Sequence, residues 1–247
     1  MTVVAFAGPS VRPEERAAFP EVEWRGPAEA GDLLRLPVGR PVTVCLIDGY
    51  FDHRPAVRHK EILLLLSEGV PIVGGSSIGA LRAVEMAPFG MQGVGAIYQA
   101  YAQARIEGDD EVALAHGPEE WDWRPLSVPL VEVRATLCRA LRTGVLDAEE
   151  ARTVREAAAT IHYVDRTWEA LLSAVPATAG GRLGAALPGV EVPLKRLDAI
   201  ACLSAAASVP PPQRPRPPAV STLFLHALME ECGIDPASRL RARSAGG

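Results

Sequence analysis

The sequence P-I-V-G-G-S-S-I-G-A-L-R-A-V-E, residues 71–85, decides the fold of this chain. A short apolar run ends at a pair of glycines, and a helix-forming run begins at Ala80. Between them, the pattern G-x-S-x-G places Ser77 between Gly75 and Gly79. A serine at this position lies on a sharp turn from strand to helix, where a helix N-terminus faces any developing negative charge. The pattern predicts either an acyl-transfer nucleophile or a tight turn in a protein that binds without catalysis.

Strand and helix signals alternate outward from this turn through the first ninety residues. Apolar or β-rich runs predict strands at residues 2–7, 22–24, 41–47 and 70–73. Helical patterns fall between them, at residues 13–19, 28–36 and 57–67. Because strands joined by helical crossovers lie parallel, we predict an α/β fold with a small doubly wound parallel sheet of the Rossmann or flavodoxin-like kind.

The chain becomes mainly helical after residue 91. Helices are predicted at residues 95–105, 129–142, 148–162, 166–173, 196–207 and 222–231, and a Gly-, Ala- and Pro-rich loop at 176–193. The run P-P-P-Q-R-P-R-P-P predicts an extended linker, since proline fixes φ and removes backbone donors. We therefore expect an α/β core at 1–125, a helical region packed on it at 126–208, a linker at 209–218, and a terminal helix with a frayed tail at 219–247.

Composition excludes several classes of function. The 247 residues carry a net charge of −5, so there is no basic footprint for nucleic acid. No Lys or Arg precedes the first apolar run, and every apolar stretch is too short for a bilayer, which predicts a cytoplasmic protein without membrane contact. The four cysteines form no C-x-x-C pair and predict free thiols: Cys45, Cys138, Cys202 and Cys232.

The sequence also predicts no cofactor and no metal. It contains no G-x-x-x-x-G-K-[ST] phosphate loop. Gly90, Gly93 and Gly95 follow no predicted strand, so we interpret them as close helix spacing rather than a dinucleotide fingerprint. The acidic run at 109–111 has ligand types that suit Mg²⁺, but it is more typical of a solvated loop.

Polar residues follow three of the predicted strands at the point where each strand ends. Gly8-Pro9-Ser10 follows the first, Asp48-Gly49-Tyr50 follows the strand at 41–47, and Gly75-Ser76-Ser77 follows the strand at 70–73. The carboxyl ends of parallel strands share one edge of a sheet, and ligands bind there. The sequence therefore predicts a functional site at that edge.

A nucleophilic serine needs a base and, usually, a carboxylate that orients the base. His59 lies at the start of the helix predicted at 57–67, beside Lys60 and Glu61, which an amphipathic pattern does not explain. His116 follows Asp110, in the Ser–Asp–His chain order of α/β-hydrolases. The orienting carboxylate is Asp48 or Asp110, and both choices of base remain open.

Several blocks of this sequence together resemble the TfuA-like protein family. They are G-P-S, I-D-G-Y-F, V-x-H-K-E-I-L, G-x-S-x-G-A-L-R-A-x-E, P-F-G-M-x-G-x-G and D-D-E-V-A-x-x-H-G, with a weaker echo at H-Y-V-D-R-T. They cover roughly the first half of the chain in unbroken order. Here G-G-S-S-I stands where G-A-S-M is commoner, which keeps the turn serine, and the C-terminal linker and tail are particular to this chain.

The resemblance implies a role beside a YcaO enzyme, which uses ATP to activate a peptide bond whose oxygen is replaced by sulfur. The TfuA-like partner is implied to deliver sulfur from a sulfur-carrier protein with a C-terminal thiocarboxylate. Substrates in the family include ribosomally made peptide natural products and a few cellular proteins.

Our hypothesis joins the two lines of argument. Ser77 attacks the thiocarboxylate carbonyl, with His59 or His116 as base and Asp48 or Asp110 as orienter. Backbone amides around Gly75, Ile78 and Gly79 hold the oxyanion. Residues taken from the matching blocks give further support to the site: Ser10, Tyr50, Lys60, Glu61 and Arg82. The alternatives are a non-catalytic adaptor that docks YcaO and positions the sulfur donor, and a hydrolase of small esters.

Overall fold

The structure is a computed structural model that describes residues 2–37, 42–50, 52, 54–209 and 221–244. Its centre is a five-stranded sheet in the order β2-β1-β3-β4-β5, with all neighbouring pairs parallel. The strands are β1 (Thr2–Phe6), β2 (Val22–Arg25), β3 (Val42–Leu46), β4 (Ile72–Gly75) and β5 (Gln92–Val94). This is the flavodoxin-like order, so the predicted parallel α/β sheet is confirmed.

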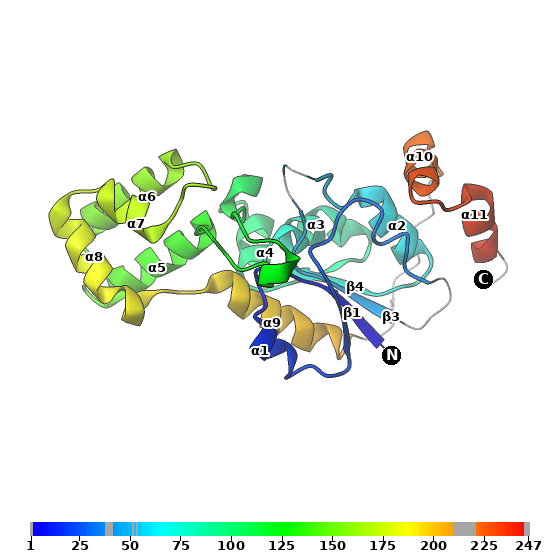
Figure 1. The fold of residues 1–247 in the computed structure, drawn as a ribbon, viewed down its shortest axis with the longest axis horizontal. Helices are drawn as coiled ribbons and strands as arrows, with labels where there is room; N and C mark the ends of the chain where they lie inside the picture. The colour runs from blue at the N-terminus through cyan, green and yellow to red at the C-terminus, as the bar shows by residue number, and fades with distance from the viewer. Residues whose placement is uncertain (1, 38–41, 51, 53, 210–220, 245–247) are drawn as a thin grey trace.

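Helices cover both faces of the sheet, because the central strands are buried on both sides. On one face, apolar residues of α2 (His59–Ser67) and α3 (Ile78–Met86) pack against Val4, Val44 and Ile72. On the other face, α9 (Leu194–Ala206) packs along β1, β3 and β4, and α1 (Pro13–Arg16) lies near it (Figure 1). The fold is doubly wound, and a helix from late in the chain completes it.

Four helices gather at the side of the sheet domain, around an apolar cluster of their own (Figure 1). They are α5 (Leu130–Arg142), α6 (Ala148–Thr160), α7 (Trp168–Ser173) and α8 (Ala177–Val190). We call them the helical region. Helix α4 (Ala96–Ala102) and the short turns η2 (Asp109–Glu111) and η3 (Glu119–Trp121) connect the sheet to it, whereas the turn η1 (Ala87–Phe89) joins α3 to β5.

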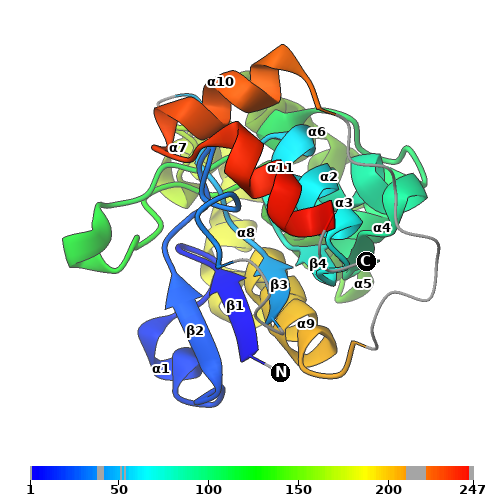
Figure 2. The same cartoon turned by 90° about the vertical axis from the view of Figure 1, so that its right-hand side faces the viewer.

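The last two helices lie over α2, on the side away from the helical region (Figure 2). They are α10 (Leu223–Glu231) and α11 (Pro236–Ser244). Leu225, Leu228 and Met229 pack against Leu34 and Leu64. In the part of the chain that the structure describes, no helix is both long and apolar enough to cross a membrane.

Four predictions of local structure were wrong. Residues 28–36 form turns rather than a helix, because the buried Glu61 carboxylate accepts amides of this segment, from Gly31 and Leu33. The predicted loop at 176–193 contains α8, since Ala179, Leu183 and Val190 bury an apolar stripe. Tertiary burial here overrides the weak helix propensity of glycine and proline.

The glycines interpreted as helix spacing flank or belong to the edge strand β5. A Cβ at Gly93 would overlap the ring of Tyr98, so the missing side chain lets α4 pack on this strand. The tail predicted to fray contains α11. The predicted linker lies almost entirely outside the described residues, and the predicted division of the core at residue 125 stays a prediction.

Candidate active site

In the turn after β4, the backbone is strained at Ser76, and the next residue, Ser77, faces a pocket. The amide of Ser77 donates to the carbonyl of Gly75 at 2.9 Å, which closes a three-residue γ-turn. Its central residue, Ser76, has φ of 67°, a value that non-glycine residues rarely adopt. The Ser76 side chain is fully buried, and no hydrogen bond partner for its Oγ lies among the described residues. Ser77 occupies the N-cap position of α3 without a side-chain capping hydrogen bond, and it lines a pocket.

Gly79 fixes how closely α3 approaches the end of β3. Its amide donates to the carbonyl of Ile47 at 3.1 Å, and a Cβ at this position would overlap the Leu46 carbonyl. The Gly79 amide, predicted to bind the oxyanion, is therefore already engaged in a structural hydrogen bond. Of the predicted backbone donors, the amide of Ile78, directly after Ser77, is the better placed candidate.

Asp48 binds the loop that follows β1. Its Oδ2 accepts the amides of Gly8 and Ser10, both at 2.9 Å, and its Oδ1 accepts the Ser10 hydroxyl at 2.7 Å. These three bonds join the carboxyl ends of β1 and β3. In this strand order the connections diverge between β1 and β3, which is where ligands bind in open α/β sheets. The predicted convergence of Ser10 and Asp48 at one edge agrees with this geometry.

Lys195, from the start of α9, reaches the same edge. The residue is 3% exposed, its Nζ donates to the carbonyl of Val112 at 3.0 Å, and Nζ lies 3.8 Å from Asp48 Oδ1. Burial lowers the pKa of Lys195 from its usual value, while the carboxylates of Asp48 and Glu132 oppose that shift. The Lys195 amide also donates to Glu132 at 3.0 Å, and burial raises the pKa of Glu132 to about 7.

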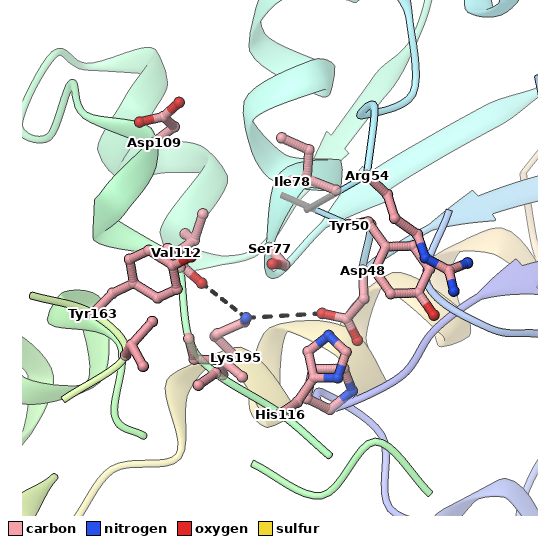
Figure 3. A pocket seen from close by; sticks show the side chains of 16 residues that line it. Asp48, Tyr50, Arg54, Ser77, Ile78, Asp109, Val112, His116, Tyr163 and Lys195 are labelled. Atoms are coloured by element: carbon pink, nitrogen blue, oxygen red, sulfur yellow. Dashed lines mark hydrogen bonds and ion pairs between the residues drawn. The ribbon is translucent and has the colours of Figure 1, made fainter. Parts of the chain in front are cut away.

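A pocket of about 230 Å³ brings these groups together (Figure 3). Figure 3 shows the Lys195 amine between the Val112 carbonyl and the Asp48 carboxylate, with Ser77 on the same side of the cavity. The pocket is lined by residues from the three strand ends, the segment after η2, α9 and the loop before α7. Those the sequence predicted are Asp48, Tyr50, Ser77, Ile78 and His116.

His116 lies in the pocket wall with one ring nitrogen already engaged. Its Nδ1 lies 2.7 Å from the carbonyl of Gly117, and its ring centroid lies 5.9 Å from that of Tyr50. A carbonyl can only accept, so Nδ1 carries the proton and the Nε2 of a neutral ring has a free lone pair. This tautomer suits a general base.

The second predicted histidine does not line the pocket. His59 lies on the surface at the start of α2, with its Nε2 2.8 Å from Glu85 Oε2. Arg82 donates to the same carboxylate at 2.6 Å and to the Val57 carbonyl at 3.0 Å. The side chains of His59, Arg82 and Glu85 thus join α2 to α3.

Other predicted residues have structural contacts or lie outside the pocket. The Glu61 carboxylate accepts the amides of Gly31, Leu33 and Arg58, which anchors the turns at 28–36 to α2. Neither Lys60 nor Asp110 lines the pocket, whereas Asp109 does. The described residues contain no cluster of three or more His, Cys, Asp or Glu side chains that could hold a metal ion.

Sequence reasoning missed Lys195, although the sequence contains a signal for it. Lys195 and Asp198 fall in the buried stripe of α9, together with Ala199, Cys202, Leu203 and Ala206. A charged residue in register with an apolar stripe must find a partner in the core. Asp198 accepts the amides of Ala96 and Ile97 at the start of α4, and Lys195 faces Asp48.

Comparison with known proteins agrees with the sequence motifs. No curated protein matches the chain. The family model described as TfuA-like protein matches residues 48–167, a segment that contains Asp48, Ser77 and His116 but ends before Lys195. This match confirms the predicted resemblance to the TfuA-like family over residues 48–167.

Proposed function

We propose that this chain is the partner of a YcaO enzyme in peptide backbone thioamidation and releases sulfur from a thiocarboxylated carrier protein by acyl hydrolysis. The family supports involvement in the YcaO-associated thioamidation system. One observation carries the hydrolytic part: Ser77 follows a strained turn at a helix N-terminus and opens into a pocket with Lys195, Asp48 and His116. Serine hydrolases use such a turn to expose their nucleophile.

The proposed reaction has two steps. First, a base takes the hydroxyl proton as Ser77 Oγ attacks the carbonyl carbon of the thiocarboxylate. The protonated base then returns this proton to the sulfur as the C–S bond breaks, which releases hydrosulfide. Second, water attacks the acyl-serine ester, which regenerates Ser77 and leaves a carboxylate on the carrier. The hydrosulfide then replaces the activated peptide oxygen at the YcaO site.

His116 is the base that the geometry favours over His59. The contact with Gly117 fixes the proton on Nδ1 and leaves Nε2 to accept a proton. Asp48 is held in place by Gly8 and Ser10 and does not contact either histidine through a described hydrogen bond. Its role here is to hold the sheet edge and to face Lys195.

The test is sulfide release from the thiocarboxylated carrier, with Ser76→Ala as the matched control for Ser77→Ala. Ser76 is the neighbouring serine on the same turn and is fully buried, so its hydroxyl does not reach the pocket. We expect Ser77→Ala to lose release by a factor of roughly 10³ or more, and Ser76→Ala to retain most of it. Equal release by wild type and Ser77→Ala would refute the hydrolase.

A non-catalytic adaptor is the second candidate, and exposed apolar side chains favour it. Leu223 and Phe224, at the start of α10, are 86% and 80% exposed. Paired apolar residues on a helix suit a docking surface for another protein. If the chain is an adaptor, the Ser77→Ala variant should still support thioamidation, and the double variant Leu223→Ser/Phe224→Ser should not. If the chain is the hydrolase, Ser77→Ala should abolish thioamidation.

A further inference from the structure

A second cavity adjoins the pocket of Ser77. It is an open groove of about 830 Å³ between the loop after β1 and the helical region. One wall is residues 8–14, and the other includes Trp168, Pro188 and Pro193. Pro9, Leu114 and Lys195 line both the groove and the pocket. Lys195 therefore lies where the groove meets the pocket.

The two cavities suit different parts of one ligand. At about 30 Å³ per water in the liquid, the 230 Å³ pocket has room for roughly eight waters, enough for a terminal group and little more. The groove is more than three times larger, and its lining mixes apolar and polar side chains. Trp121 and Leu126, which line it, are 62% and 50% exposed. An extended polypeptide has this mixture of apolar side chains and polar backbone groups.

The Lys195 amine faces Asp48 but makes no hydrogen bond to it. The two Asp48 oxygens already accept three hydrogen bonds from Gly8 and Ser10, and Nζ lies 3.8 Å away, beyond hydrogen bond distance. An ammonium group has three N–H donors. Within the described residues, the Nζ has one hydrogen bond, to the Val112 carbonyl. Donor capacity thus remains at the junction of groove and pocket.

We propose that Lys195 anchors the anionic terminal group of a polypeptide tail lying in the groove, and so sets the tail's last carbonyl beside Ser77. The proposal rests on the proposed function, for which the tail is the C-terminus of the carrier protein. A thiocarboxylate is an anion and resists attack by a nucleophile. An ammonium group in contact with it neutralises this charge and favours the tetrahedral intermediate.

The first test measures binding without turnover. The probe is a fluorophore-labelled hexapeptide with the carrier's own C-terminal sequence, prepared as free acid and as C-terminal amide, and binding is followed by anisotropy. Wild type should bind the acid about ten- to a hundredfold more tightly than the amide, as expected for hydrogen bonds to a charged group. Lys195→Met should remove this preference, and Lys195→Arg should keep part of it.

Two further variants locate the tail. Trp121→Ala, in the groove, should weaken the acid and the amide equally, because the side chain contacts the tail and not its terminus. Arg152→Met, which removes an exposed cation in α6, should change neither affinity. Equal binding of acid and amide by wild type would overturn the anchor, and so would a full acid preference in Lys195→Met.

The binding test and the release test can refute the anchor and the hydrolase independently of each other. Ser77→Ala should bind the acid as wild type does, because the hydroxyl is not the anchor. If Ser77→Ala still releases sulfide while the acid preference depends on Lys195, the hydrolase fails and the anchor stands. Release that depends on Ser77, with no acid preference in wild type, would leave the hydrolase and remove the anchor.

Discussion

The sheet edge and the helical region are stabilised in different ways. At the edge, buried polar groups bond across long stretches of sequence, as Asp48 does with Ser10 and Asp198 does with the start of α4. The helical region is held mainly by an apolar cluster that includes Val133, Val154 and Leu183. Hydrogen bonds of buried polar groups depend on direction and distance, whereas apolar packing adjusts to small changes. The edge should therefore tolerate substitution poorly, and the helical region should tolerate it well.

The largest expected effect is a difference in sulfide release between variants of two histidines, one at the sheet edge and one on the outer surface. His116→Ala removes the proposed base and should lower sulfide release by about 10²- to 10⁴-fold, the usual contribution of general base catalysis. His59→Ala breaks an exposed contact with Glu85 and should leave release within about twofold of wild type. Steady-state rates on the thiocarboxylated carrier measure both. If His59→Ala lost more release than His116→Ala, the base would be His59, on α2, and not His116.

Among substitutions that add a single methyl group at the sheet edge, Gly79→Ala should destabilise the protein most. Its Cβ would overlap the backbone carbonyl of Leu46, which cannot rotate away, so α3 must shift from β3. We expect a loss of about 3 kcal/mol or more in the free energy of unfolding, at the upper end for overpacked sites. Urea denaturation measures this loss. A loss below about 1 kcal/mol would show that the edge adjusts as easily as the helical region.

Asp48→Asn should destabilise the edge by leaving Lys195 without its facing carboxylate. Removing either partner of a buried charge pair leaves the other charge uncompensated, so Asp48→Asn and Lys195→Met should each cost about 3 kcal/mol. The double variant should lose less than the sum of the two single losses, by about 1 kcal/mol or more. Additive losses in urea denaturation would show that the two side chains do not interact.

The edge could be predicted from the sequence because its signals are local. Each strand end carries its own polar residues, and the parallel sheet brings Ser10, Asp48 and Ser77 together by topology alone. The return of α9 beneath the sheet is a long-range event, with Lys195 147 positions after Asp48, and no local pattern specifies it. Likewise, α8 was missed because its glycines and proline are weak helix formers whose burial only the folded chain reveals.

His59 shows the opposite failure, a local signal with a structural explanation. The run H-K-E stood out because it breaks the amphipathic pattern at the start of α2. In the structure, Glu61 binds backbone amides of another segment and His59 pairs with Glu85 on α3. Polar residues with structural and catalytic roles look alike until their partners are known.

The link between the two regions should depend on pH through Glu132, which lies on α5 and accepts the Lys195 amide. Its pKa is raised from 4.5 to about 7 by burial, so the fold favours the protonated form. This stabilisation is full below pH 4.5 and is lost as the pH rises through 7. Relative to Glu132→Gln, wild type should lose about 1–2 kcal/mol of stability over that window, after allowing for solvent screening. Parallel pH profiles of the two proteins would contradict this.

The smallest effect should come from two neighbouring glycines in α8, and it should reverse in sign between them. A Cβ at Gly181 meets no atom within 4 Å, so Gly181→Ala should stabilise the helix by up to about 1 kcal/mol. At Gly180 a Cβ would lie 2.6 Å from the Leu172 carbonyl of α7, and Gly180→Ala should therefore destabilise by about 1–3 kcal/mol. Thermal melts of the two variants measure both. Should Gly180→Ala prove neutral, α7 has moved aside, and the helical region would be as adjustable as its apolar packing implies. A destabilising Gly181→Ala would mean instead that the exposed face of α8 is covered in solution, and the contrast with the sheet edge would weaken.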